Sequence, residues 1–210
     1  MMNPIRLSFL IVILLLLAAW IVTHPLPRPT QPENTRFVKI DAEGKAMGAW
    51  KGPWRCVEDR DTGLLWEVKS YLEADLQDRR CSFSWFDGQT GVQKGGNCFG
   101  DYPLSDIQNL IDHLNTIQLC GQNNWRAPSE KELRSLIISK PKPGRAQVDL
   151  DYFPYTQKSM YWTSEHNIPL EGIFARYGNG AKAFSFFENT TRVIPYHESC
   201  RVRLVSDPKK

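Results

Sequence analysis

Apolar residues recur at helical spacing near the middle of the chain. They fall every three or four positions, which is the period of one face of an α-helix. These positions are Ile107, Leu110, Ile111, Leu114 and Ile117. Ser105 is placed to cap this helix, and Asp106 would then lie in the first turn, where a negative charge is favourable. We expect the helix to end near Cys120 and Gly121.

A second, shorter helix is predicted directly after Pro128. Ser129 and Glu132 form the S-x-x-E capping box, in which each side chain bonds the backbone N–H of the other residue. The buried stripe of this helix consists of Leu133, Leu136 and Ile137. The prolines at positions 141 and 143 cannot continue a helix, so they mark its end.

The remaining pattern consists of short β-prone runs between turn residues. The runs are Arg55–Val57, Gly63–Glu67, Ser82–Phe86, Tyr161–Ser164, Gly172–Tyr177, Ala183–Phe187 and Arg201–Val205. Residues 87–104 and 139–160 carry no such run of useful length, and we predict long ordered loops there.

The amino terminus carries an apolar run that directs the chain to a membrane. It extends from Leu7 to Val22, is interrupted only by Ser8 and follows a single cation, Arg6. A cleaved signal peptide has an apolar core of about 7–15 residues followed by small residues, whereas this run is longer and ends in Trp-Ile-Val. We therefore favour an uncleaved anchor over residues 1–23, a transmembrane helix that crosses through residues 5–23, and keep a cleaved signal as the alternative. Arg6 would stay in the cytoplasm, and the chain after Val22 would cross the membrane.

A proline-rich linker follows the apolar run. It covers residues 24–35, where four prolines favour extended backbone and remove hydrogen-bond donors. The folded domain is expected over residues 36–206, with a short tail at 207–210.

Composition and charge exclude several classes of protein. The 210 residues include 26 Lys and Arg against 23 Asp and Glu, for a net charge of +3, and two of the cations lie in the first 28 residues. The body is therefore nearly neutral, which argues against nucleic-acid binding. The five cysteines include no C-x-x-C pair and the four histidines are scattered, so a structural zinc site or a thioredoxin-type site is not expected. We predict no metal and no cofactor.

Several strings of residues occur in a recognisable order along the body. They are Cys56-Val57, Thr62-Gly63-Leu64-Leu65-Trp66-Glu67, Leu119-Cys120-Gly121, Asn124-Trp125-Arg126-Ala127-Pro128-Ser129, Tyr152-Phe153-Pro154, Tyr161-Trp162-Thr163-Ser164 and Arg201-Val202-Arg203-Leu204-Val205. Together they resemble the bacterial domain family typified by the C-terminal domain of the Legionella collagen-like protein. The resemblance runs from about Phe37 to Val205.

The resemblance carries expectations about the fold. It implies an α+β domain, related to C-type-lectin-like folds and to sulfatase-modifying enzymes, with two short helices and long irregular loops. A small, twisted antiparallel sheet would join the two ends of the domain. With the anchor, it implies a single-pass protein of the bacterial inner membrane whose domain lies on the periplasmic side, or a secreted domain if the leader is cleaved.

The family pattern and the exported location together suggest a cysteine pairing. Exported proteins meet an oxidising environment in which disulfides persist. We favour Cys56 with Cys120, and then Cys81 with Cys98, which leaves Cys200 as the free thiol. This chain departs from the family pattern at Ser105 and Ala127 as well as at Cys81 and Cys200, so other pairings stay open.

The function that the resemblance implies is binding without catalysis. We expect a cell-envelope module that recognises a polysaccharide, in particular an anionic or sulfated one, or else docks on an envelope protein. The sequence does not decide whether the protein forms homo-oligomers. The candidate ligand residues are Trp125, Arg126, Lys131, Arg134, Lys140, Lys142 and Arg145. A structural role is the stronger interpretation of Trp125 and Arg126, because they directly precede a helix cap in a loop-rich fold.

An enzyme of the sulfatase-modifying kind is the less favoured alternative. Those enzymes depend on a close pair of cysteines in the C-terminal part, whereas here Cys200 is the sole cysteine after Cys120. A calcium-dependent lectin is not favoured either, because the loop strings Glu-Pro-Asn, Gln-Pro-Asp and Trp-Asn-Asp are missing. We therefore predict no catalytic residues.

Overall fold

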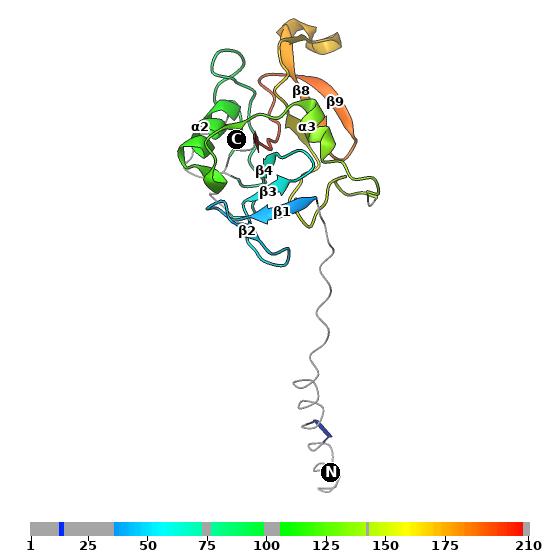
Figure 1. Cartoon of the computed structure of the whole chain (residues 1–210). Helices are drawn as coiled ribbons and strands as arrows, with labels where there is room; N and C mark the ends of the chain where they lie inside the picture. Colours follow the sequence, from blue (N-terminus) through cyan, green and yellow to red (C-terminus); the bar gives the residue numbers. More distant parts are fainter. Residues whose placement is uncertain (1–12, 15–35, 73–76, 99–105, 142, 208–210) are drawn as a thin grey trace, which may run out of the picture. The chain divides into compact units, whose positions relative to one another are not determined.

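The computed structural model describes residues 13–14, 36–72, 77–98, 106–141 and 143–207 (Figure 1). Most of the predicted anchor, the proline-rich linker, Ser105 and Lys142 lie outside these residues. None of the helices in the described ranges is both long enough and apolar enough to span a bilayer.

The first of two sheets has six strands in the order β2-β1-β3-β4-β10-β5, and all neighbours are antiparallel. The strands are β1 Phe37–Ile40, β2 Ala46–Met47, β3 Cys56–Asp59, β4 Leu65–Glu67, β5 Trp125–Arg126 and β10 Val205–Ser206. Trp66 pairs with Val57 on one side and with Val205 on the other. This sheet joins the beginning and the end of the domain, as we predicted.

The second sheet was not predicted. It is antiparallel and is built around β8, which pairs with β6, β7 and β9. The strands are β6 Met160–Trp162, β7 Ile168–Pro169, β8 Asn179–Ser185 and β9 Thr190–Pro195. The expectation of a single small sheet is therefore wrong, because β8 and β9 form a six-residue ladder of their own, from Gly180 opposite Pro195 to Ser185 opposite Thr190.

Both predicted helices are present. Helix α2 spans Ile107–Thr116 and helix α3 spans Glu130–Ser135, which begins with the predicted capping box of Ser129 and Glu132. The cap of α2 is Asp106 and not Ser105, because the Asp106 carboxylate accepts the backbone N–H of Asn109 at 2.9 Å. Its other oxygen accepts the N–H of Lys94 at 3.0 Å, so the cap also holds the long loop before the helix.

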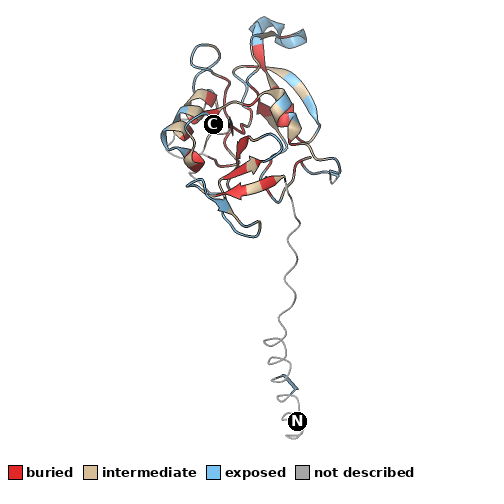
Figure 2. Cartoon of the chain, in the orientation of Figure 1, coloured by how far each residue is buried: buried red, intermediate tan, exposed pale blue. Residues whose placement is uncertain are grey.

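Three of the predicted strands are wrong over all or most of their length. Ser82–Phe86 forms no strand, because its residues make only isolated bridges to separate segments, such as Phe83 with Cys200. Gly172–Tyr177 forms an exposed 3₁₀-helix, η2 (Figure 2). Its first residue, Gly172, and the residue after it, Gly178, have positive φ angles, which are not those of a strand. The run Arg201–Val205 enters a strand only at Val205. A second short 3₁₀-helix, η1, covers Leu119–Gly121 where α2 was expected to end.

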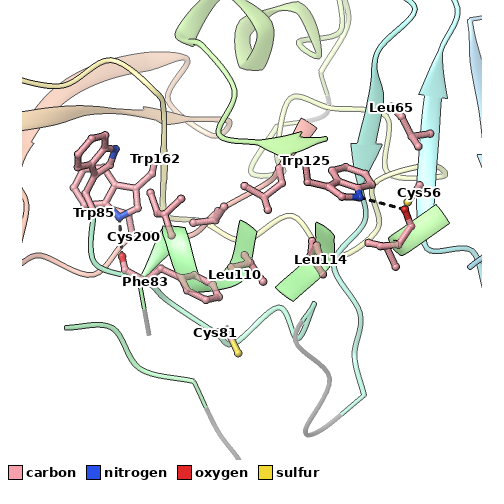
Figure 3. Packing of buried hydrophobic residues seen from close by; sticks show 14 of the residues in the cluster. Cys56, Leu65, Cys81, Phe83, Trp85, Leu110, Leu114, Trp125, Trp162 and Cys200 are labelled. Carbon is pink, nitrogen blue, oxygen red and sulfur yellow. Dashed lines mark hydrogen bonds between the residues drawn. The ribbon is translucent and has the colours of Figure 1, made fainter. Parts of the chain in front are cut away.

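The core consists of two apolar clusters with the sheets between them. The first holds Leu65, Trp125, Trp162 and residues of α2, whereas the second holds Trp66, Tyr161 and residues of α3. Because successive residues of a strand point to opposite faces, neighbours such as Leu65 and Trp66 enter different clusters. Figure 3 shows part of the first cluster, in which the indoles of Trp125 and Trp162 each donate to a backbone carbonyl.

Two disulfides tie the irregular segments to this core, and they are the pairs that we favoured. Cys56–Cys120 joins β3 to η1, and Cys81–Cys98 closes the loop before α2. Cys200 is free and buried. The α+β class and the antiparallel pairing follow the prediction; the finer likeness to a C-type lectin remains a proposal.

Candidate functional site

Trp125 lies in the core. Its side chain is 2% exposed, and its indole Nε1–H donates to the carbonyl of Leu119 at 3.2 Å. Its backbone N–H donates to Asn115 Oδ1 at 2.6 Å. A sugar has no access to the ring in this position, so Trp125 is an anchor that joins β5 to η1 through its indole and to α2 through its backbone.

Arg126 is held by two carboxylates. Its guanidinium lies 2.7 Å from Glu132 Oε1 and 2.7 Å from Asp207 Oδ1. Hydrogen bonds to these two groups, first Asp207 and then Glu132, raise the pKa of Arg126 above its usual value. The arginine therefore joins the start of α3 to the chain end after β10, and its charge is largely neutralised.

Arg134 is also engaged. It contacts Glu130 Oε1 at 2.8 Å and Asn189 Oδ1 at 2.7 Å, and Glu130 lies 3.1 Å from Lys182 Nζ on its other side. Hydrogen bonds from Arg134 and Thr191, with help from Lys182, lower the pKa of Glu130 to about 2. This ionic cluster fastens α3 to β8 and β9.

The Glu130 cluster predicts a pH dependence of stability. The folded chain holds the carboxylate in its ionised form, so its contribution is complete above the usual glutamate pKa of 4.5 and is lost as the pH falls toward 2. Glu130→Gln should lower the free energy of unfolding by about 1 kcal/mol at pH 7. In this variant, the free energy of unfolding should also fall less steeply as the pH decreases from 4.5 to about 2. Urea denaturation at several pH values measures both effects. Glu171→Gln, at an exposed glutamate, is the matched control and should leave the profile unchanged.

The remaining predicted cations face solvent. Lys131, Lys140 and Arg145 are exposed, and Lys142 lies outside the described residues. Lys140 and Arg145 line a surface pocket of about 310 Å³ together with Asp149 and Asp151. The floor is apolar and includes Ile138, Val148 and Leu150. We call this the 140–151 pocket; the structure brings two of the seven candidate residues together in it.

An aromatic cluster near the two carboxylates was missed by the sequence analysis. Lys39 Nζ lies 3.6 Å from the ring centroid of Trp54 and 5.5 Å from that of Tyr152. Burial lowers the pKa of Lys39, and the charges of Asp151 and Asp149 oppose that shift. Trp54 and Tyr152 lie 98 residues apart in the sequence, so no local spacing predicts their contact. The only signal for this cluster in the sequence was the presence of an aromatic residue in each of two loops.

The free thiol does not show the features of a reactive cysteine. Cys200 is 4% exposed, and burial raises its pKa to about 12, so the thiol stays protonated near neutral pH. It borders a second pocket, of about 400 Å³, beside Met160 and Ile194. His197 is exposed and its ring packs on that of Tyr177 at 4.7 Å. Among the described residues, no group of three or more His, Cys, Asp and Glu could hold a metal ion.

Comparison with known proteins gives one match. The family model described as the Lcl C-terminal domain matches residues 55–206, which cover most of the body from β3 to β10. The matched span includes both disulfides and the 140–151 pocket. No curated protein and no solved structure matches the chain significantly.

Proposed function

Because the chain belongs to the Lcl C-terminal domain family, we propose that its body is a non-catalytic binding module of the bacterial cell envelope. Its ligand is a polysaccharide that carries negative charge. The apolar run through residues 5–23 holds the module at the membrane, on the periplasmic side.

The 140–151 pocket is the observation that supports this function. Lys140 and Arg145 supply two positive charges, which attract the sulfate or carboxylate groups of a polysaccharide. Asp149 and Asp151 on the same pocket offer acceptors for sugar hydroxyls. The pocket volume of about 310 Å³ lies in the range of sites for small ligands, so it fits one or two sugar units and not a whole chain.

The proposal predicts specific retention on heparin. The wild-type protein should stay bound at physiological salt, and Lys140→Ala with Arg145→Ala should weaken binding about tenfold because two cation–anion contacts are lost. Elution from heparin-agarose along a salt gradient, together with titration calorimetry, measures the change. Lys45→Ala with Lys51→Ala removes the same charge from exposed positions elsewhere and is the control.

Two outcomes would contradict the proposal. One is elution of the wild-type protein together with a neutral protein. The other is an equal loss of retention in both double variants, because net charge and not the pocket would then explain the binding.

A second candidate function, docking on an envelope protein, is favoured by η2. Ile173 is 81% exposed, and Phe174 and Tyr177 of the same segment are 41% and 44% exposed. Exposed apolar side chains of this kind often mark contacts with partners. Recovery of one protein at fixed stoichiometry from membrane fractions, without heparin retention, would favour this function over polysaccharide binding.

A further inference from the structure

Two exposed tyrosines lie side by side on the surface. Tyr71 is 63% exposed and Tyr155 is 36% exposed, and their ring centroids are 5.9 Å apart at an angle of 38°. Tyr71 follows β4 and Tyr155 lies in the loop before β6, so the fold brings them together from distant parts of the sequence. Leu72, next to Tyr71, is also 63% exposed.

An arginine lies against both rings. The guanidinium carbon of Arg79 is 4.4 Å from the ring centroid of Tyr71 and 5.7 Å from that of Tyr155. The Arg79 backbone N–H donates to the carbonyl of Ser70 at 3.0 Å, which fixes this segment beside Tyr71. The two rings therefore hold the cation in place before any ligand arrives.

Within the described part of the chain, the charge of Arg79 acts on Asp78, where it helps Arg80 to keep the pKa of that carboxyl below its usual value against the opposing effect of burial. No ion pair and no side-chain hydrogen bond engages the guanidinium of Arg79 in that part of the chain, whereas the neighbouring Arg80 pairs with Asp78 at 2.6 Å. Packing does not explain the cluster either, since the Tyr71 ring stays largely in water. Arg79 is therefore a positioned cation with no direct ion-pair partner among the described residues, and it lies beside two solvent-exposed tyrosine rings. Such an arrangement suits recognition of an anionic ligand.

We propose that Tyr71, Tyr155 and Arg79 form a subsite for a sugar that carries a carboxylate, that is, for a uronic acid unit of a polysaccharide. The planar guanidinium matches a carboxylate with two parallel hydrogen bonds. The tyrosine faces pack against the apolar C–H face of the sugar ring, and their hydroxyls bond its hydroxyl groups. The inference rests on the proposed function, and it adds a subsite apart from the cations of the 140–151 pocket.

The size of the cluster favours a sugar over a protein. Protein interfaces of ordinary stability bury about 800 Å² on each partner. Three side chains offer far less area than that, but they match one or two sugar units. A carboxylate on the ring would bring the affinity that stacking alone does not supply.

The test uses the full-length protein in detergent with two forms of one polysaccharide. Calorimetric titration should show binding of polygalacturonate at least tenfold tighter than binding of its methyl-esterified form, which keeps the ring but loses the charge. Arg79→Gln should remove this preference. Tyr71→Ala should weaken binding of both forms about tenfold, whereas Tyr71→Phe should keep most of it.

Controls separate this subsite from the rest of the surface. Trp50→Ala alters another aromatic residue, 67% exposed, and should leave both affinities unchanged. Unchanged circular dichroism and thermal midpoints show that the variants fold. Lys140→Ala with Arg145→Ala should lower heparin retention while the preference for free carboxylates persists.

The outcomes distinguish the two proposals. Heparin binding without polygalacturonate binding, or equal affinity for both polygalacturonates, would overturn the subsite and leave the proposed function standing. Polygalacturonate binding that survives both Tyr71→Ala and Arg79→Gln would overturn the subsite as well. A protein that binds neither heparin nor either form of polygalacturonate would overturn both proposals.

Discussion

Replacing Cys56 and Cys120 together by alanine is expected to lower the free energy of unfolding by about 4 kcal/mol. The disulfide joins residues that are 64 positions apart, so its loss restores a large conformational freedom to the unfolded chain. Both residues are almost fully buried in the first core cluster, next to η1. Urea denaturation under non-reducing conditions measures the change, and the variant should unfold at a markedly lower urea concentration.

A matched pair and a single variant serve as controls. Alanine at Cys81 and Cys98 opens a closed segment whose ends are only 17 residues apart, for which we expect a smaller loss of about 3 kcal/mol. Cys200→Ala removes a buried thiol without opening a cross-link, so its effect should be smaller still. Equal stability of the Cys56 and Cys120 double variant and the wild type would show that this cross-link does not hold the loops.

Trp125→Ala is expected to lower the free energy of unfolding by about 3–5 kcal/mol, because it leaves a cavity in the first cluster. The indole is fully enclosed and donates to the carbonyl of Leu119, so the substitution also removes a buried hydrogen bond. Thermal and urea denaturation measure the loss. A decrease of this size with no change in heparin affinity at a temperature where the variant is folded would mark Trp125 as a core residue.

Trp125→Phe separates packing from the hydrogen bond. It keeps an aromatic ring in the cluster but loses the donor to Leu119, so it should cost less than the alanine variant. A ligand role would give the opposite pattern. Heparin affinity would then fall in both variants while the stability changed by less than about 1 kcal/mol.

Local chemistry made both helices predictable. The capping box of Ser129 and Glu132 uses residues three positions apart, so the sequence contains the whole signal. The same holds for the apolar stripe of α2. Its cap was assigned one residue too early because Ser105 and Asp106 are both good caps, and the choice depends on which side chain reaches the N–H of Asn109.

The strands were harder to predict, since a strand needs a partner that local sequence does not name. Gly172–Tyr177 has β-prone residues but no neighbour, and it forms η2 instead. The strand β9 was missed, although β-branched residues at positions 190, 191, 193 and 194 were a usable signal. Its pairing with β8 gives the second sheet.

The candidate site was predictable only in part for the same reason. The sequence identified the cations at 140 and 145, but their carboxylate neighbours in the pocket became clear only from the structure. The sequence indicates Arg126 and Arg134 as candidate ligand residues, whereas the structure pairs each of them with acidic residues. Charge alone does not show whether a cation is already neutralised, because its partner can lie anywhere in the chain.

The order of residues along the chain was sufficient to indicate the family and the two helices, because these depend on short spacings and on recognisable strings. It favoured the two cysteine pairs but left other pairings open, and the structure decided between them. Folding decided which side chains meet. The two sheets bury alternate residues in different clusters, and Tyr71, Tyr155 and Arg79 become neighbours although up to 84 positions separate them. Such contacts depend on the packing of the whole chain, and no local pattern carries them.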